Sequence, residues 1–435
     1  MTKSMFSSML IWFLFLLPFL PAPTVSGIPL SFVRIGALIF IFSWATKSLL
    51  NKKIILPLSV PGLFLGAFVF LSMVSVLWAA SPTLAMRKEF LWLSIFPLSI
   101  IFWHKFFNGY DTDATENASM FRLRDATIAS SAALGFLAIT QFAAQFVFGY
   151  QAVSNFLAKN ITPIFVGIPA AEIINQNSSW LVNIEGQTIM RSVVNFPEPH
   201  TLALFLGLTL PFALIAAITN SQKRLLYITA SFLILTGLIL TFSRGAYVAL
   251  VFSLISIIPF VGHKLKTKKT GVILIFIITL FLFFGQPISS RFISSFDASE
   301  GSNAGRILIW EKAIEVFKQN PVVGVGLGNY PTTQDDLISS RSPINAHNTY
   351  LEIAIELGLL GLLLWMGVLI STFLALFRRA NPNTLAFGAL SGLVFFSIHG
   401  FFETIIYSPQ NLVLFSLILA AAFGANNKTK ERITD

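Results

Sequence analysis

The chain alternates between long apolar runs and shorter polar connections along almost its whole length. An apolar run of about 17–25 residues is long enough to cross a bilayer as a helix. About twelve runs approach or reach this length, so the pattern predicts an all-α integral membrane protein with about 12 transmembrane helices. The runs lie at residues 5–20, 29–49, 60–79, 90–107, 127–148, 201–219, 225–242, 246–261, 271–285, 351–377, 385–401 and 405–423.

The first run has two interpretations. Lys3 precedes a short apolar stretch that is followed by Val25-Ser26-Gly27, a pattern that also fits a cleaved signal peptide. We favour a retained helix, and the topology of the remaining runs is the same in either case.

Two polar intervals, 149–200 and 286–350, are much longer than the other connections. Within the second, residues 304–319 are predicted to form an amphipathic helix. Its apolar positions recur at helical spacing, and Asn320-Pro321 should end it. The glycine-spaced stretch 322–330 is too apolar to be freely solvated, so we expect this interval to lie on the membrane surface and fold back over the helices. The apolar positions are Ile307, Trp310, Ile314 and Phe317.

No polar interval is long enough for a separate soluble domain, and residues 1–435 are predicted to form a single polytopic domain. Only 11% of the residues are charged, whereas soluble domains carry about 25%. The net charge of +10 therefore has to be compared with the positive-inside rule before nucleic acid is considered as a partner. Without cysteine, disulfides and thiolate metal sites are excluded.

The basic residues predict the orientation of the chain. With both termini in the cytoplasm, 18 of the 29 Lys and Arg residues lie on the cytoplasmic side. The other 11 comprise 7 Arg and 4 Lys, and three of these arginines share the interval 286–350 with His347. Because the planar guanidinium suits phosphate oxygens, we expect a site for an anionic, lipid-linked substrate on the extracytoplasmic face. The three arginines are Arg291, Arg306 and Arg341.

Two arginines each have a functional and a structural interpretation. Arg244 lies in the short hairpin 241–246 between two runs, where it would either bind a ligand or extend its charge to the membrane boundary. We favour ligand binding. Arg306 lies near the start of the amphipathic helix, where unpaired N–H groups attract anions, or it pairs with Glu311 or Asp297.

His347 is the candidate general base. We expect it to start the helix of the tenth run, with Asn345 as a cap, and imidazole can accept a proton from a sugar hydroxyl near neutral pH. Glu352 is a candidate for orienting His347 or an arginine, as an acidic residue inside an apolar run. Arg191 would be a second phosphate contact or a solvated loop residue.

We find no pattern for a metal site on the outer face. Asp111 and Asp113 have the spacing of a metal–nucleotide-sugar motif, but their polar loop is predicted to be cytoplasmic and solvated. Asp335 and Asp336 are interpreted as solvated in the same way.

Four motifs in order resemble the O-antigen ligase and O-antigen polymerase superfamily, which also includes pilin-type O-oligosaccharyltransferases. The resemblance is strongest over residues 191–361 and extends to the helix count of the whole chain. The motifs are SRGA at 243–246, GRxxxW at 305–310, NPVVGVGLGNY at 320–330 and AHNTYLEIAIELGLLG at 346–361.

The resemblance implies a metal-independent, inverting glycosyltransferase with a GT-C-like fold and no cofactor. It would move a glycan from undecaprenyl diphosphate, or another polyprenyl diphosphate, to an acceptor hydroxyl on the extracytoplasmic face of the bacterial inner membrane. Arg244 and Arg306 match the family's phosphate-contacting arginines and His347 matches its catalytic histidine. Arg191 matches less well, because Ser192-Val193-Val194 departs from the family pattern, and Glu403 is the candidate for an acidic position.

Two alternatives stay open at this point. A ligase, acting on a lipid A–core or other surface acceptor, and a polysaccharide polymerase differ in their acceptor, and no residue distinguishes them. A transporter or flippase of an anionic substrate is the second alternative. We prefer glycan transfer because the charges gather at one face and the two halves of the chain do not match. The expected partners are the lipid-linked donor, the glycan acceptor and membrane lipids, without nucleic acid.

Overall fold

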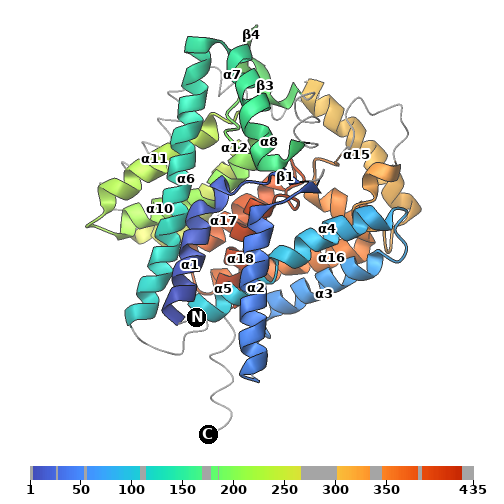
Figure 1. Cartoon of the computed structure of the whole chain (residues 1–435), viewed down its shortest axis with the longest axis horizontal. Coiled ribbons are helices and arrows are strands. Elements are labelled where there is room, and N and C mark those ends of the chain that lie inside the picture. The colour runs from blue at the N-terminus through green and yellow to red at the C-terminus, as the bar shows by residue number, and fades with distance from the viewer. Residues whose placement is uncertain are drawn as a thin grey trace. The chain divides into compact units, whose positions relative to one another are not determined.

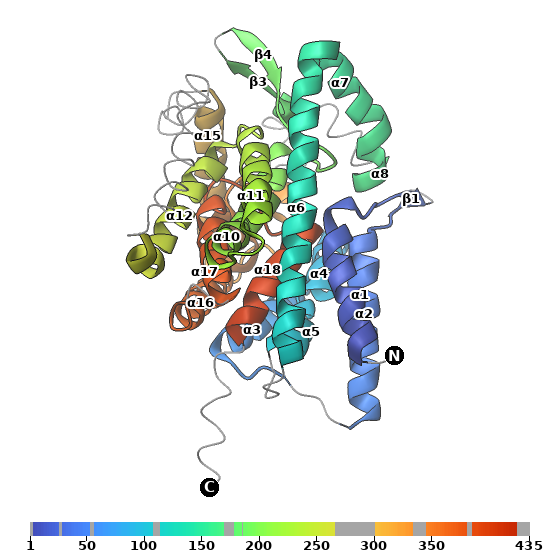
Figure 2. The ribbon, with the colours of Figure 1, turned by 90° about the vertical axis from the view of Figure 1, so that its left-hand side faces the viewer.

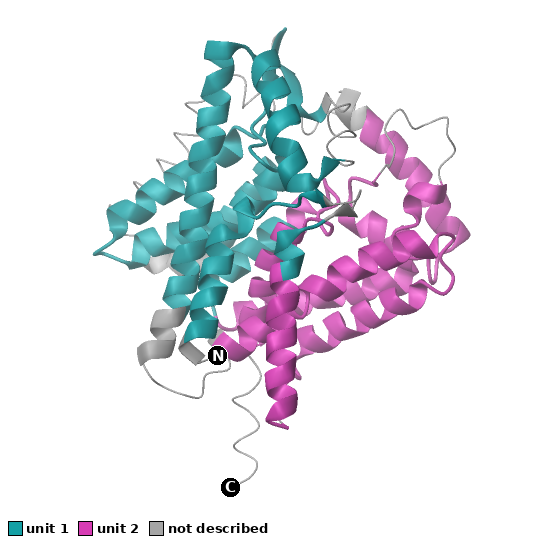
Figure 3. Ribbon diagram, in the orientation of Figure 1, with its two compact units in different colours: residues 1–35, 113–297, 380–396 teal, residues 36–112, 298–379, 397–435 magenta. Residues whose placement is uncertain are grey.

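The computed structural model describes residues 3–25, 28–52, 56–107, 114–168, 178–184, 186–265, 301–333, 345–380 and 385–423. The described chain is helical apart from two short antiparallel hairpins (Figure 1). It divides into two compact units: unit 1 comprises residues 1–35, 113–297 and 380–396, and unit 2 comprises residues 36–112, 298–379 and 397–435 (Figure 3).

The elements up to the second hairpin are α1 (Lys3–Leu16), η1 (Leu17–Phe19), β1 (Thr24–Val25), β2 (Ile28–Pro29), α2 (Phe32–Leu50), α3 (Val60–Ser75), α4 (Pro82–Ile95), α5 (Leu98–Phe102), the π-helix η2 (Trp103–Phe107), α6 (Ala114–Phe148), α7 (Tyr150–Phe156), the π-helix η3 (Leu157–Ile161), α8 (Thr162–Val166), η4 (Ser178–Trp180), β3 (Leu181–Ile184) and β4 (Gln187–Met190). The later elements are α10 (Pro199–Thr219), α11 (Arg224–Ile239), α12 (Arg244–Leu265), α15 (Gly301–Gln319), η6 (Tyr330–Thr333), α16 (Thr349–Phe377), α17 (Leu385–His399) and α18 (Pro409–Phe423).

Within the described residues, four helices are long and apolar enough to cross a membrane, by length and composition. Six shorter apolar helices coincide with other predicted runs. The ninth predicted run, 271–285, lies outside the described residues, so the total of about twelve spans stays a prediction. The four long segments are Phe32–Leu50, Met120–Phe148, Pro199–Thr219 and Thr349–Phe377.

Two predicted regions differ from the structure in detail. The run predicted at 90–107 is divided into α4, α5 and a π-helix, and α4 begins earlier, at Pro82. Pro82 suits a first helical turn, where no backbone N–H is needed, and Pro97 separates α4 from α5 because proline cannot donate to the preceding turn. The interval 149–200 is not a plain loop, since it contains α7, α8 and the β3–β4 hairpin.

Unit 1 is built on close contacts between α6, α10 and α11, which lie together in Figure 2. A Cβ atom at Gly135 of α6 would lie 2.3 Å from the carbonyl oxygen of Leu233 in α11. One at Gly237 would lie 2.8 Å from the Cα atom of Gly135. Small residues let two apolar helices approach this closely, which provides the dense packing that holds helices together in a bilayer.

Unit 2 has an aromatic core between α3, α4, α16 and α18. Phe68, Trp92 and Trp365 are fully buried, and the ring centroids of Trp92 and Trp365 each lie 5.1 Å from that of Phe68. The indole N–H of Trp92 donates to the carbonyl of Ile406 at 3.1 Å, so its polar atom is paired inside the core. This core lies between the helices that carry Lys88, Glu352 and Glu356.

The helix α16 is interrupted at Gly358, which has φ +67°. The break leaves the carbonyls of Ile355 and Glu356 free of helical partners, and they accept the N–H groups of Val325 and Gly326 at 3.0 and 2.9 Å. Beyond the break, Leu359 donates to the carbonyl of Pro321 at 2.8 Å. Irregular backbone at membrane depth persists only where its polar groups are paired, and here the glycine-spaced loop supplies those partners.

Candidate active site

His347 lies just before α16 rather than in it. The prediction that His347 starts the helix after Asn345 is wrong, because the cap is Asn348, whose side chain accepts the N–H groups of Tyr350 and Leu351. His347 has φ +47°, a left-handed conformation that non-glycine residues seldom adopt. Such backbone strain gathers at functional sites, where the surrounding structure enforces it.

The segment that carries His347 is tied to the turn after α17. The N–H of Thr349 donates to the carbonyl of Gly400 at 2.7 Å, and its hydroxyl donates to the carbonyl of Glu403 at 2.8 Å. The same hydroxyl accepts the N–H of Ile405 at 3.0 Å. These bonds hold Glu403 beside His347, although 56 residues separate them in sequence.

Glu403 bridges the candidate base and a candidate phosphate ligand. Its Oε2 lies 3.0 Å from Nδ1 of His347, while its Oε1 forms an ion pair with Nη2 of Arg306. The Glu403 side chain is 5% exposed, whereas those of Arg306 and His347 are 22% and 35% exposed. The carboxylate is therefore buried behind two candidate groups that are themselves partly exposed.

The GRxxxW motif has a direct structural explanation. Arg306 and Trp310 lie one turn apart on α15, and the indole N–H of Trp310 donates to the carbonyl of Ala346 at 2.9 Å. The helix thus contacts Glu403 through Arg306, and it contacts the segment that carries His347 through Trp310. The helix itself and its end at Gln319 agree with the prediction.

The packed face of α15 is rotated from the predicted one. Ile307 and Ile314 are 38% and 43% exposed, while Ala313 is fully buried against Tyr330 and Ala346. Periodicity alone missed this because the inner face carries Arg306, which is charged, and Ala313, which is only weakly apolar.

A second charged cluster lies deeper along α16. Glu352 and Glu356 have side chains that are 0% and 1% exposed, and Nζ of Lys88 on α4 lies 3.6 Å and 2.9 Å from their carboxylates. The hydroxyl of Tyr407 donates to Glu356 at 2.7 Å, and Lys88 stands 3.8 Å from the centroid of the Tyr407 ring. Glu352 also accepts the N–H of Ala346, the neighbour of His347, at 2.6 Å. Glu352 thus connects the cluster to the segment of the candidate base.

Lys88 and Tyr407 were missed from the sequence. Lys88 sits beside Arg87 and Glu89 in a run that resembles an ordinary charged membrane boundary. The pair Glu352 and Glu356 inside an apolar run could have indicated such a partner. Buried carboxylates need a cation, and in an apolar run that cation must come from elsewhere in the chain.

Unit 1 contains the other two candidate arginines, on neighbouring segments. Arg191 follows β4, and its Nε donates to the carbonyl of Thr241 at 2.7 Å while Nη1 donates to the carbonyl of Ser179 at 2.9 Å. Arg244, the first residue of α12, is buried and lies three residues beyond Thr241. The hairpin predicted at 241–246 is present as the turn between α11 and α12.

The segment after Arg191 is rigidly held. Gln141 of α6 accepts the N–H groups of Val193 and Val194 at 3.0 and 2.7 Å, and Val194 has φ +54°. Phe242, in the turn before Arg244, has φ +48°. A left-handed backbone is unfavourable for a β-branched residue such as Val194 and for an aromatic residue such as Phe242. The surrounding structure must therefore impose these two conformations.

Some of the residues singled out from the sequence lie outside the described residues. They are Arg291, Arg341, Asp111, Asp113, Asp335 and Asp336. Within the part of the chain that the structure describes, no group of three His, Asp or Glu side chains could hold a metal ion.

Similarity to known proteins agrees with the motifs. Residues 229–366 match the O-Antigen ligase family, a range that includes Arg244, Arg306, His347 and Glu352. The exopolysaccharide production protein ExoQ of Rhizobium meliloti (strain 1021) is 22% identical over 425 residues, which is 90% of this chain and 83% of that protein. An O-antigen polymerase of Salmonella muenchen is 27% identical over 213 residues, 47% of this chain and 50% of that protein. The resemblance seen in the motifs is thereby confirmed over residues 229–366, the part of this multi-pass membrane protein that matches the O-Antigen ligase family.

Proposed function

We propose that the protein transfers a glycan from a polyprenyl diphosphate carrier to an acceptor hydroxyl on the extracytoplasmic side of the bacterial inner membrane. The observation that carries this proposal is the bridge from Arg306 through Glu403 to His347. It brings a guanidinium and an imidazole to one buried carboxylate, which supports a phosphate contact and a proton acceptor at the same site. The family match supports a lipid-linked glycan as the substrate.

In the proposed reaction, the acceptor oxygen forms a bond to the anomeric carbon of the donor sugar. The bond from that carbon to the diphosphate oxygen breaks, and the diphosphate leaves with the electron pair. Direct displacement inverts the anomeric configuration. The acceptor proton passes to Nε2 of His347, because Glu403 holds Nδ1 at 3.0 Å and thus favours the tautomer with the proton on that nitrogen. The carboxylate also stabilises the imidazolium that forms.

Arginines take the role that a metal ion has in many phosphate-dependent enzymes. Negative charge develops on the leaving diphosphate, and preorganised donors aimed at that charge lower the barrier. Arg306 is held by Glu403 through one nitrogen, which leaves its other N–H groups for phosphate oxygens. The roles of Arg244 and Arg191 as further diphosphate contacts rest on the motif resemblance, and Arg191 already donates to two backbone carbonyls.

The test is the His347→Ala variant, with two measurements on purified protein. Loss of a positioned base should lower product formation by about 10²–10⁴-fold while donor-lipid binding persists. Normal turnover would make His347 structural and transfer the base role to another group, such as Glu352 or Glu403. Loss of donor binding would instead place His347 among the phosphate ligands. If the parent protein moves labelled lipid between leaflets without making a glycosidic bond, a transporter is favoured.

A second candidate function, polysaccharide polymerisation, is favoured by the name of one relative, and the name of the other relative also refers to a polysaccharide. The protein that aligns with 90% of the chain is an exopolysaccharide production protein, and the other is an O-antigen polymerase. Both functions use the same chemistry and differ in the acceptor. A polymerase given only lipid-linked repeat units should produce a ladder of longer glycans, whereas a ligase should need a separate acceptor and add the donor glycan once.

A further inference from the structure

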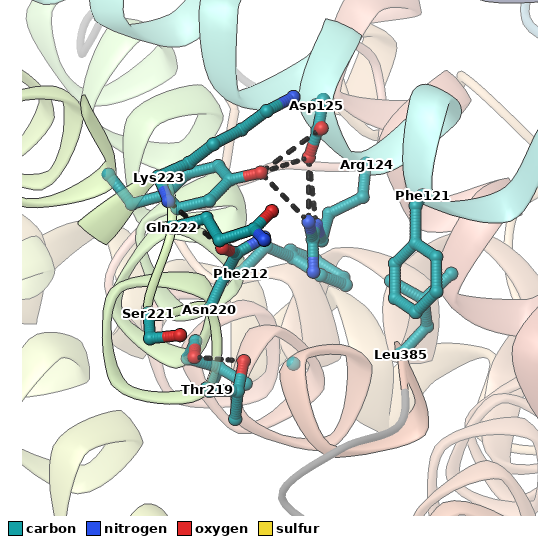
Figure 4. Close-up of a pocket in the computed structure, with 13 residues that line it drawn as sticks. Phe121, Arg124, Asp125, Phe212, Thr219, Asn220, Ser221, Gln222, Lys223 and Leu385 are labelled. Atoms are coloured by element: carbon teal, nitrogen blue, oxygen red, sulfur yellow. Dashed lines mark hydrogen bonds and ion pairs between the residues drawn. The ribbon is translucent and has the colours of Figure 1, made fainter. Parts of the chain in front are cut away.

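Unit 1 contains a cavity of about 500 Å³ where α10 ends and α11 begins (Figure 4). Its walls come from α6, α10, the connection 220–223, α11 and the first residues of α17. Because α11 has 16 residues, about 24 Å of helix separates this cavity from the turn that precedes Arg244. The cavity is therefore distinct from the arginine-bearing segments of unit 1 that we assign to the donor.

A buried and firmly oriented arginine faces this cavity. Arg124 is 9% exposed, and its Nε and Nη2 donate to Oδ1 of Asp125 at 3.0 and 2.8 Å. Nη2 also donates to the hydroxyl of Tyr227 at 3.0 Å. No residue in the described ranges accepts a hydrogen bond from Nη1, and Figure 4 shows one guanidinium nitrogen of Arg124 directed away from Asp125 into the cavity. Nη1 of Arg124 is therefore available to a ligand that enters the cavity, while Nε and Nη2 hold the guanidinium in a fixed orientation.

The charge and polarity of the lining indicate what that ligand is. Among the described residues that line the cavity, Arg124 and Lys223 are cationic, and the one carboxylate, Asp125, already accepts from Arg124 and Tyr227. The cavity lining therefore has a net positive charge, which favours an anionic ligand. Phe121, 44% exposed, and Leu385 add an apolar wall beside these cations. An anionic head with an apolar body fits a lining of this kind.

We propose that the cavity binds the phosphate headgroup of an anionic phospholipid. The free N–H groups of Arg124 and the ammonium of Lys223 would contact phosphate oxygens, while an acyl chain would lie along Phe121 and Leu385. In the proposed orientation the connection 220–223 is cytoplasmic, so the lipid would come from the inner leaflet. A water-soluble phosphate offers the same head, and the apolar wall favours the lipid over it.

Native mass spectrometry of the full-length protein in detergent tests this proposal. The protein is titrated with phosphatidylglycerol and, separately, with phosphatidylcholine that has identical acyl chains, so that only the headgroup differs. We expect tighter binding of phosphatidylglycerol, and Arg124→Gln should weaken it by about tenfold, as for one charge-assisted hydrogen bond. Lys223→Gln should weaken it by a smaller factor. Arg122→Gln, an exposed arginine on the same helix, is the matched control and should bind as the parent protein does.

Arg124→Gln leaves Asp125 without its cation, so the double variant Arg124→Gln/Asp125→Asn accompanies it. Size-exclusion behaviour and helical content show whether each variant is folded, and the folded variant that loses phosphatidylglycerol binding supports the site. Equal binding of the two lipids, or equal loss in the Arg122→Gln control, would overturn it. If inorganic phosphate displaces phosphatidylglycerol at comparable concentration, the ligand is a soluble phosphate and the lipid assignment is wrong.

Discussion

At the scale of single residues, one carboxylate organises the candidate site. Glu403 is almost completely buried, and it contacts both a guanidinium and an imidazole. The ion pair with Arg306 and the contact with His347 offset the burial of this carboxylate, because an unpaired buried charge is costly. The arrangement occupies Nδ1 of His347 and one nitrogen of the Arg306 guanidinium, so that Nε2 is the ring nitrogen we propose for the acceptor proton.

We predict that Arg306→Lys loses most transfer activity although the charge is kept. A lysine ammonium cannot pair with Glu403 and still present a planar pair of N–H donors to a diphosphate. Initial rates of product formation at equal protein level give the measurement. Lys312→Gln, on an exposed part of the same helix, is the control and should retain activity. Near-normal turnover of Arg306→Lys would contradict a bidentate phosphate contact.

Replacing Glu403 by Gln should reduce the maximal rate by about 10²–10⁴-fold, since the amide neither stabilises an imidazolium nor fixes the ring tautomer. Donor KM should change less than kcat. Glu403→Asp, which keeps the charge, should recover part of the rate, and Glu315→Gln, 62% exposed on α15, serves as the control. A kcat that stays normal in Glu403→Gln would show that the carboxylate only supports the fold.

At the scale of elements, the interrupted helix α16 and the loop 320–330 depend on each other through backbone hydrogen bonds. The loop donates to carbonyls before the break and accepts an N–H beyond it, so neither segment is satisfied without the other. The N-terminal half of α16 carries Glu352 and begins two residues after His347. The break thereby fixes the orientation of the half-helix that supports the site.

Gly358→Ala should destabilise the protein by about 1–3 kcal/mol. Its φ of +67° disfavours any side chain, and the added Cβ atom would lie 2.1 Å from the carbonyl oxygen of Val322. Thermal unfolding in detergent provides the measurement. The matched control is Gly66→Ala in α3, where a Cβ atom meets nothing within 4 Å and should be neutral or slightly stabilising. If Gly358→Ala and Gly66→Ala unfold at the same temperature, the break at Gly358 does not require glycine and the prediction is wrong.

At the scale of the whole molecule, the question is which charges neutralise the leaving diphosphate. The proposal assigns this to Arg306, with Arg244 and Arg191 as further contacts. Arginines on a membrane face can supply the electrostatic stabilisation for which other enzymes use a divalent ion.

Transfer activity is accordingly expected to persist in excess EDTA. The assay is product formation by purified protein before and after chelation, with a known Mg²⁺-dependent glycosyltransferase treated in parallel to show that chelation is complete. Activity that disappears with EDTA and returns with Mg²⁺ or Mn²⁺ would rule out the metal-free mechanism and bring Asp335 and Asp336 back into consideration.

Some features of this protein follow from the sequence by itself. Long apolar runs determine an all-helical membrane protein, because only helices satisfy the backbone of such segments internally. Asn320-Pro321 determines the end of α15 at Gln319, and the ordered motifs lie within residues 229–366, which match the O-Antigen ligase family. These are local or contiguous signals, and each depends on residues close together in the chain.

Other features were decided only by the tertiary structure. Glu403 meets His347 across 56 residues, and Lys88 meets Glu356 across 268, pairings that no local pattern specifies. The left-handed backbone of His347 and the break at Gly358 depend on hydrogen bonds to segments far along the chain. The inner face of α15 follows from what Arg306 and Trp310 contact rather than from apolar spacing. Hydrophobic periodicity reports burial averaged over an element, whereas a site of this kind depends on which buried polar group finds which distant partner.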